Sequence, residues 1–221
     1  MKILIASDLH GSARCCRKLL EAWDRENPDQ VVLLGDILYH GPRNDLPDEY
    51  DPKAVLAMLN ERRERILCVR GNCDTEVDQM VLAFPILAEY AWILLSENCR
   101  IFATHGHLWH PEHLPPMAAG EILLFGHTHV PAWEMREGVR CFNPGSVSIP
   151  KGDSQRGYMM YEKEVFLWKT LDGEVFHSET ADGETYNPRL RYMIQFSYSA
   201  EKSRLRRAGG GEYPEDQFQG E

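Results

Sequence analysis

The amino-acid sequence predicts an α/β domain in which two packed sheets are flanked by helices. Short apolar runs recur along the first half of the chain and end abruptly in glycine or polar residues, as Val31–Leu34 does before Gly35 and Asp36. Segments with helical periodicity lie between the first few of these runs, whereas short strand patterns follow one another from Ala132 onward. An uninterrupted apolar run is typical of a strand buried on both faces, which requires helices to cover the sheet.

Composition places the 221-residue chain among globular proteins, with 43% hydrophobic residues and a formal charge of −10. No apolar run approaches the ~18 residues of a membrane-spanning helix. The acidic balance argues against a nucleic-acid partner, because nonspecific affinity for nucleic acid comes from clustered Lys and Arg. The six cysteines lack CxxC spacing, so we expect reduced thiols and a cytoplasmic protein. Composition leaves homo-oligomer formation open.

The first predicted unit is a strand, a helix and a second strand. Lys2 to Ala6 forms the first strand, and the helix runs from an N-cap at Ser12 to about Glu26. The strand that ends before Asp36 completes a βαβ unit, in which the two strands are parallel. Asp8 and Asp36 therefore emerge at one edge of the sheet, where open α/β sheets bind their ligands.

A long loop, a helix and a third strand follow. Residues 38–52 form the loop, and Asp51 caps a helix that has Pro52 at its first position. Ile66 to Val69 is the third buried strand, and a short helix is expected from Thr75 to about Phe84. Long loops in compact domains are often functional, and this one leaves the same sheet edge as Asp36.

Strands dominate the rest of the chain. Residues 91–95 and 100–104 are expected to pair as a hairpin, and residues 122–125 form another buried strand. Shorter strand patterns, punctuated by glycines, follow at residues 132–135, 139–143, 157–161, 165–171 and 175–178. We therefore predict one domain over residues 1–183 and a polar, weakly ordered tail over residues 184–221, in which Tyr192 to Tyr198 could add a strand.

Seven side chains with metal-ligand chemistry stand just after predicted strands. They are Asp8, His10, Asp36, Asn72, His105, His127 and His129. Two pairs are spaced two residues apart, which in an extended segment points both side chains to one face. Carboxylates, imidazoles and an amide without cysteine favour Mn, Fe, Ni or Zn over a thiolate zinc site. Seven ligands exceed the needs of one catalytic metal, whereas two metals that share a carboxylate account for them.

The motifs that carry these residues resemble the signature of the calcineurin-like metallophosphoesterases. The matching pieces, in chain order, are Asp8-x-His10, Gly35-Asp36, Gly71-Asn72, His105-Gly106-His107 and Gly126-His127-x-His129. Within that superfamily the chain is similar to bacterial YfcE-type phosphodiesterases, through Asn72-Cys73-Asp74, Gly41-Pro42-Arg43-Asn44 and the turn from Asn143 to Pro150. The resemblance covers residues 1 to about 180 and implies a four-layer αββα sandwich with two mixed sheets.

The resemblance also implies an activity and a role for each residue. One divalent ion, with manganese expected first, would be held by Asp8, His10 and His129, and a second by Asn72, His105 and His127, with Asp36 bridging them. The implied reaction is hydrolysis of a small-molecule phosphodiester by a metal-activated hydroxide that attacks phosphorus. Many relatives carry a histidine after the asparagine to protonate the leaving group, whereas Cys73 is a poorer general acid at neutral pH. The catalytic candidates are Asn72, Cys73 and Asp74, with Asp74 orienting Asn72.

Several residues and alternatives stay open from the sequence alone. Arg43 and His40 in the long loop are candidates for substrate contact, because an arginine can bind phosphate through two hydrogen bonds. His107, His110 and His113 lie near the motifs, but the seven ligand positions are already filled. The main alternative function is a phosphomonoesterase at the same site, which Cys73 argues against. A non-catalytic scaffold like Vps29 is opposed by the intact ligand set, and a nuclease by the acidic balance.

Overall fold

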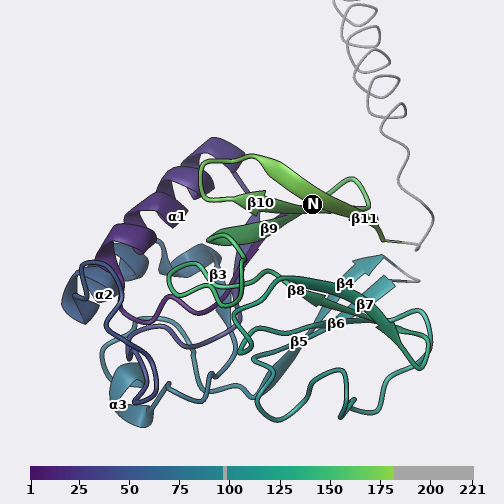
Figure 1. Cartoon of the computed structure of the whole chain (residues 1–221), viewed down its shortest axis with the longest axis horizontal. Coiled ribbons are helices and arrows are strands. Elements are labelled where there is room, and N and C mark those ends of the chain that lie inside the picture. The colour runs from purple at the N-terminus through teal and green to yellow at the C-terminus, as the bar shows by residue number, and fades with distance from the viewer. Residues whose placement is uncertain (97–98, 182–221) are drawn as a thin grey trace, which may run out of the picture. The chain divides into compact units, whose positions relative to one another are not determined.

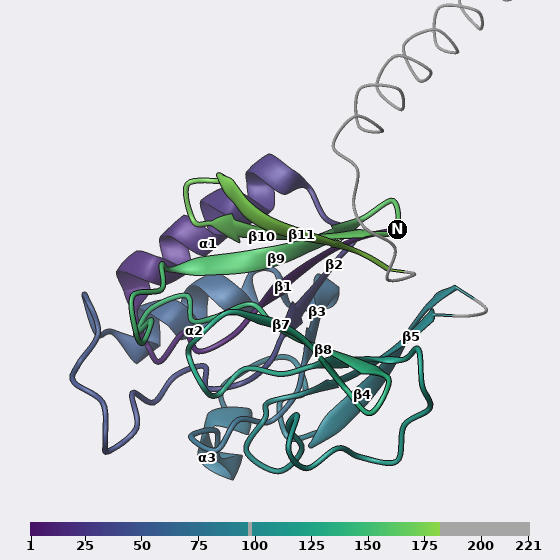
Figure 2. The same ribbon diagram turned by 45° about the vertical axis from the view of Figure 1, so that its right-hand side comes forward.

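The computed structural model describes residues 1–96 and 99–181, which form two stacked sheets with helices against one of them (Figures 1 and 2). The chain divides into two units after Glu184, and every described residue belongs to the first. The predicted tail and its strand at Tyr192 to Tyr198 lie outside the described residues. Over the described ranges, no helix is long and apolar enough to cross a membrane.

The first sheet has six strands in the order β11-β10-β9-β1-β2-β3. Its strands are β1 (Lys2–Ala6), β2 (Gln30–Leu33), β3 (Ile66–Cys68), β9 (Gly157–Glu162), β10 (Val165–Thr170) and β11 (Val175–Thr180). β1, β2 and β3 are parallel, whereas β9, β10 and β11 pair antiparallel along the other edge of β1. The predicted βαβ unit is confirmed, and the three parallel strands end at one edge.

The second sheet has five strands in the order β4-β5-β6-β8-β7. Its strands are β4 (Tyr90–Ser96), β5 (Cys99–Thr104), β6 (Ile122–Leu124), β7 (Ala132–Arg136) and β8 (Val139–Asn143). β4 and β5 form the expected antiparallel pair, and β5, β6 and β8 are parallel to one another. The segments that follow β5 and β6, which begin the two histidine motifs, therefore leave the sheet at the same edge.

The helices begin where the sequence predicts. In α1 (Ala13–Glu26) the Ser12 side chain accepts a hydrogen bond from the Cys15 amide, and Asp51 caps α2 (Pro52–Asn60) in the same way. A short 3₁₀ helix, Arg63–Arg65, leads into β3. α3 spans only Glu76–Gln79, shorter than expected, because the Gln79 side chain hydrogen-bonds the backbone of residues 82, 84 and 86 in place of further helical turns.

Alternation along the central strands explains their uninterrupted apolar sequences. In β1, Leu4 and Ala6 pack against the helices with Leu19 and Trp23, whereas Ile3 and Ile5 pack between the two sheets. Successive side chains of a strand point to opposite faces, so a strand covered on both sides needs apolar residues at every position. The ligand motifs thus begin on rigid, fully buried strands.

The outer layers differ between the two sheets. α1 and α2 cover the first sheet, whereas Trp109, Leu114 and Met117 from the loop over residues 108–120 cover Phe102, Leu123 and Phe125 of the second. Three prolines in this loop remove backbone donors that a helix would use. The predicted α/β fold with two mixed sheets is confirmed, and in the described ranges its fourth layer is this loop rather than a helix.

Candidate metal centre

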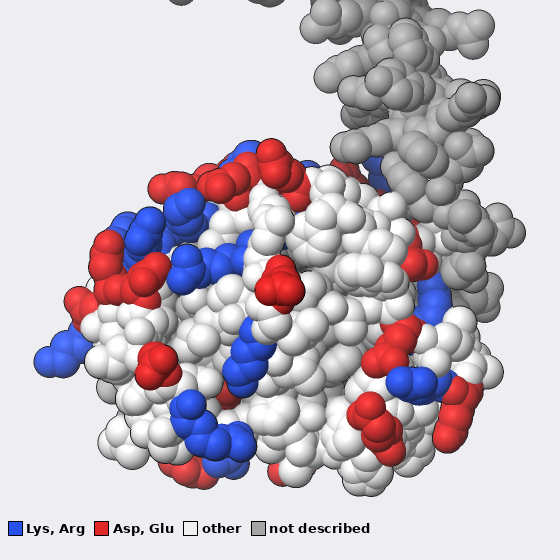
Figure 3. All heavy atoms as spheres, viewed as in Figure 1, with Lys and Arg blue, Asp and Glu red and all other residues white. Residues whose placement is uncertain are grey.

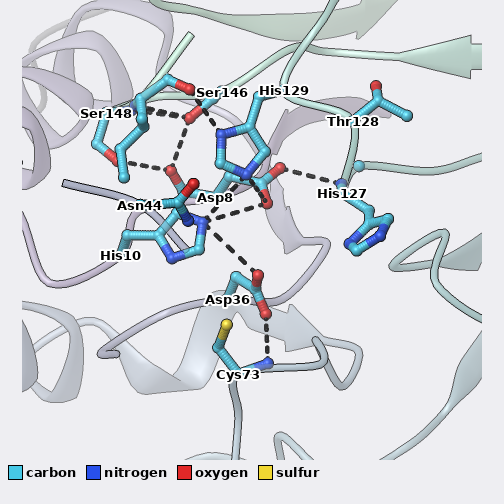
Figure 4. Close-up of polar contacts among 12 residues, drawn as sticks. Asp8, His10, Asp36, Asn44, Cys73, His127, Thr128, His129, Ser146 and Ser148 are labelled. Carbon is cyan, nitrogen blue, oxygen red and sulfur yellow. Dashed lines mark hydrogen bonds and ion pairs between the residues drawn. The ribbon is translucent and has the colours of Figure 1, made fainter. Parts of the chain in front are cut away.

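The seven predicted ligands lie just after strands whose ends meet in one crevice, and Figure 4 shows Asp8, His10, Asp36, His127 and His129 among them. In the first sheet, Asp8 and His10 follow β1, Asp36 follows β2 and Asn72 follows β3. In the second sheet, His105 follows β5, and His127 and His129 follow β6. Five of these side chains belong to residues that are almost completely buried: Asp8, His10, Asp36, His105 and His129. Two carboxylates and three imidazoles so far from solvent must compensate one another's charges or bind a cation.

The first group consists of Asp8, His10 and His129. The Nε2 atoms of His10 and His129 lie 3.2 Å apart, and Asp8 Oδ1 lies 3.6 Å and 3.3 Å from them, respectively. Asp8 Oδ1 is buried without a hydrogen-bond partner among the described residues. Two imidazole nitrogens and an orphaned carboxylate oxygen that face one point are the donor set of a divalent transition metal, and these residues therefore fit such an ion.

Backbone carbonyls fix the orientation of three histidine rings. The Nδ1 atom of His10 lies 2.8 Å from the Tyr39 carbonyl oxygen, and the Nδ1 atoms of His105 and His129 lie 2.6 Å from those of Leu34 and Ile149. A ring that donates its Nδ1 proton to a carbonyl presents the lone pair of Nε2 to a metal. All three rings are thus oriented with Nε2 toward the site. At His105 a bound metal would displace the proton that this nitrogen holds between Asp36 and Asn72.

Asp36 lies between the first group and a second one. Its Oδ2 atom is 3.6 Å from His10 Nε2 and 3.4 Å from His105 Nε2, and its Oδ1 atom accepts a hydrogen bond of 2.8 Å from the Cys73 amide. His105 Nε2 is also 3.1 Å from Asn72 Oδ1, and the His127 ring centroid is 5.1 Å from that of His105. A single carboxylate oxygen therefore faces both groups.

Five of the seven residues adopt a left-handed backbone conformation. Their φ angles are 59° at Asp8, 48° at His10, 55° at Asp36, 63° at His127 and 63° at His129. Non-glycine residues adopt this region rarely and at some cost, typically at functional sites. The expectation that the pairs Asp8/His10 and His127/His129 lie in extended segments is wrong, because all four residues have a left-handed backbone conformation. The side chains of His127 and His129 accordingly point apart (Figure 4).

Two glycines allow the strand ends to approach closely enough. A Cβ atom on Gly71 would lie 2.1 Å from Asp36 Oδ1, and one on Gly126 would lie 2.0 Å from Ser7 Oγ and 3.0 Å from Asp8 Oδ2. Real Cβ atoms essentially never make contacts near 2 Å, so a side chain at position 71 would displace Asp36, and one at position 126 would displace Ser7 and press on Asp8. These glycines in the motifs are required by close approach of the backbone.

Asp74 positions the Asp36 loop rather than Asn72. Its carboxylate accepts hydrogen bonds from the amides of Asp36 at 2.8 Å, Ile37 at 2.9 Å and Gly71 at 2.7 Å. Asn72 is instead held by His105 and, through its amide group, by Cys73 Sγ at 3.2 Å. Asp74 therefore ties the end of β2 to the end of β3.

The turn from Asn143 to Pro150 supports Asp8 from behind. Ser146 Oγ and Ser148 Oγ donate to the Asp8 carbonyl oxygen at 3.0 Å and 2.8 Å (Figure 4). Both serines are buried. The sequence of this turn resembles that of YfcE-type phosphodiesterases. Its contact with Asp8, however, is a tertiary contact that no local sequence pattern reveals.

A cleft of about 420 Å³ opens onto the ligands. Asp36, Asn72, Cys73, His127 and His129 contribute to its wall, as do two cationic residues, Arg43 and Lys151. Arg43 is exposed on the wall of the cleft, and its contact with substrate stays a prediction. The sequence does not single out Lys151, because its only local signal is that it follows the turn from Asn143 to Pro150.

His40, the other predicted substrate contact, does not line this cleft. Its ring packs edge-on against Tyr39 and Tyr50, with ring centroids 4.7 Å and 5.1 Å away. Its carbonyl oxygen accepts a hydrogen bond of 2.8 Å from the Asn44 side chain, which does line the cleft. His40 thus supports, from within the same loop, the segment that forms one wall of the cleft.

Electrostatic interactions keep the carboxylates charged and give His105 and His127 very different pKa values. Burial alone would raise the pKa of Asp36, but the hydrogen bond to His105 and the charges of His105 and His10 lower it well below its usual range. Burial alone would lower the pKa of His105, but Asp36 and Asp8 raise it to about 9. Burial and the positive charge of His105 lower the pKa of His127 to about 4.

Metal uptake at neutral pH should therefore release protons. Below pH 9 the metal-free protein holds a proton on His105 that a metal must displace, and we expect apparent affinity for Mn²⁺ to rise with pH from 6 to about 9. The ion pair between His105 and Asp36 contributes its full stabilisation of the metal-free fold below about pH 6.5, the pKa of a histidine in the unfolded chain. That stabilisation is lost as the pH rises through about 9, the pKa of His105 in the folded protein. Calorimetric titrations in buffers of different ionisation enthalpy count the protons. An affinity independent of pH would contradict this assignment.

The chain is similar in sequence and in structure to known phosphoesterases. Residues 1–164 match the calcineurin-like phosphoesterase superfamily domain. The chain is 48% identical over 165 residues to phosphodiesterase YfcE of Escherichia coli K12, covering 75% of this chain and 89% of that protein. A solved structure of the E. coli phosphoesterase YfcE aligns with a TM-score of 0.79 at 44% identity, over 82% of this chain and 100% of that one. Vps29 from Chaetomium thermophilum shares the fold, with a TM-score of 0.54 at 16% identity over 81% of this chain and 98% of that one.

Proposed function

Because the chain belongs to the calcineurin-like phosphoesterase superfamily, we propose that it hydrolyses a small-molecule phosphodiester with the help of two divalent metal ions. Membership of the family makes it a metal-dependent phosphoesterase, and the proposal adds the number of ions and the substrate class. The observation that carries the proposal is the position of Asp36 Oδ2, which faces His10 in one group and His105 in the other.

The proposed ligand sets follow the two groups. Asp8, His10 and His129 would hold one ion, Asn72, His105 and His127 the other, and Asp36 would contact both. Such ions, when bound, lower the pKa of water and offset charge on phosphoryl oxygens. Nitrogen and oxygen donors without thiolate ligands support manganese as the native metal, with Fe, Ni or Zn as other fits. Six buried free thiols support the expected cytoplasmic location.

The residues of the cleft would bind and orient the ester. Arg43 and Lys151 place positive charge where the nonbridging phosphoryl oxygens would lie. Asp36 and Asp8 hold the imidazoles in place, and Asp74 holds Asp36 through its backbone. These groups are set before substrate arrives, so little reorganisation is needed during reaction.

Cys73 is the feature that favours diesters over monoesters. Its thiol is buried, and burial together with the charge of Asp36 raises its pKa to about 12. Such a weak acid is a poor proton donor to a leaving alkoxide. The chain therefore suits esters whose leaving group needs little protonation, and a phosphomonoesterase at this site is the second candidate.

Two other functions receive less support. On the face seen in Figure 3, Lys and Arg side chains stand in small groups beside acidic residues, without the continuous basic surface that nucleic acid requires. The likeness to Vps29 shows the fold alone, and the buried ligands that this chain keeps favour an enzyme over a protein-binding scaffold.

A substrate comparison tests the proposal. Protein reconstituted with Mn²⁺ should hydrolyse bis-p-nitrophenyl phosphate well and p-nitrophenyl phosphate poorly. Both esters release p-nitrophenolate, so the comparison isolates the second ester group, which adds binding in the diester. The same assay across Mn²⁺, Fe²⁺, Ni²⁺ and Zn²⁺ ranks the metals. A preference for the monoester in every metal would replace the diesterase assignment with the monoesterase.

A further inference from the structure

A second pocket adjoins the cleft. It has a volume of about 360 Å³ and shares two wall residues with the cleft, His127 and Thr128. Its other lining includes His107, Glu112 and Glu134. A ligand whose phosphoryl group lies at the metal centre can therefore extend past His127 into this pocket.

The cleft and the pocket differ in the charged side chains on their outer walls. Arg43 and Lys151 line the cleft, whereas Glu112 and Glu134 line the pocket. The two carboxylates have neighbours, since Glu112 Oε2 lies 2.9 Å from His110 Nδ1 and Glu134 Oε2 lies 2.7 Å from an Arg136 nitrogen. Each of these contacts uses one carboxylate oxygen. The pocket thus keeps acceptor capacity for a group that brings hydrogen-bond donors.

The remaining lining is mixed, as in a site for a small organic group. Phe125, Val130 and Ala132 supply apolar surface. His107 Nδ1 is buried and has no hydrogen-bond partner among the residues that the structure describes. The apolar surface beside two carboxylates suits a small organic group that also carries a hydroxyl or ammonium group.

Electrostatics decide which end of a diester enters the pocket. The leaving oxygen gains negative charge as its bond to phosphorus breaks, and the carboxylates of Glu112 and Glu134 would oppose that charge. Arg43 and Lys151 would favour it. The leaving group therefore belongs on the cleft side, and the ester group that stays on the product belongs in the pocket.

We propose that this acidic pocket binds the retained ester group of the diester and selects a neutral or cationic group, such as an amino alcohol, over an anionic one. The inference rests on the proposed diesterase function of the adjacent metal centre. It names Glu112 and Glu134 as specificity-determining residues for that reaction.

A charge series of substrates tests the pocket. Three p-nitrophenyl phosphodiesters share one leaving group and differ in the second ester group, which is 2-aminoethyl, ethyl or 2-carboxyethyl. With the Mn²⁺ enzyme, kcat/KM should fall in that order by about fivefold per step, mainly through KM, as for partly exposed charge pairs. The double variant Glu112→Gln, Glu134→Gln should flatten the series, while the exposed control Glu21→Gln should keep it.

Binding supplies a second readout. Saturation-transfer NMR on the protein loaded with diamagnetic Zn²⁺ should detect the aminoethyl protons of the cationic diester and lose that signal in the double variant. Failure of all three diesters to react would overturn the proposed function. Reaction of all three at rates that ignore charge, in wild type and variant alike, would overturn the pocket assignment while leaving the diesterase intact.

Discussion

Replacing Asp36 with asparagine should abolish hydrolysis and remove at least one metal ion while the protein stays folded. Asp36 Oδ2 faces His10 and His105 from a single atom, and the neutral amide cannot supply the charge that two cations need from a shared ligand. Loss of several kcal/mol of transition-state stabilisation corresponds to a fall of about 10³-fold or more in kcat/KM. The amide of residue 36 still donates to Asp74, which preserves the loop.

Metal content and circular dichroism, measured beside activity, separate this effect from unfolding. Asp45→Asn is the matched control, because Asp45 is an exposed aspartate of the same loop region. It should keep both metal ions and full turnover. Full activity in Asp36→Asn, or two ions retained by it, would remove the bridging role from the account.

Replacing Asp74 with asparagine should damage stability and metal binding together. Its carboxylate accepts hydrogen bonds from three backbone amides, and an asparagine must turn a donor toward at least one of them. Hydrogen bonds to charged groups contribute ~1.5–3 kcal/mol each, so we expect the free energy of unfolding to fall by about 2–4 kcal/mol. The same loop carries Asp36, so affinity for the second metal should fall as well.

Asp78→Asn provides the comparison for Asp74. Asp78 accepts hydrogen bonds from the Thr75 amide and hydroxyl in a capping box at α3, away from the ligands. Loss of such a cap costs about 1 kcal/mol and should leave metal binding unchanged. Equal effects of the two substitutions in urea unfolding and metal titration would show that Asp74 has no special link to Asp36.

The sequence predicts where the site lies better than how it is built. Apolar runs that end in polar residues locate the ends of β1, β2, β3, β5 and β6, because a strand buried on both faces has a strong local signature. The spacing of Asp8 and His10 also places both at the site. It does not predict their left-handed backbone, which tertiary contacts impose.

Residues that reach the site through tertiary contacts leave little local signal. Lys151 lines the cleft because the turn before it folds back on Asp8 through Ser146 and Ser148. Asp74 stands next to Asn72 and Cys73 in sequence, yet its bonds go to the adjacent strand end. The loop over residues 108–120 likewise replaces an outer helix, an outcome that depends on the apolar face of the second sheet.

Anomalous diffraction from crystals of the Mn²⁺-loaded protein tests the central claim most directly. The account predicts two manganese peaks ~3.5–4 Å apart, with the Asp36 carboxylate between them. One peak should lie among Asp8, His10 and His129, and the other among Asn72, His105 and His127. A single peak at saturating Mn²⁺, or a second peak away from Asp36, would contradict it.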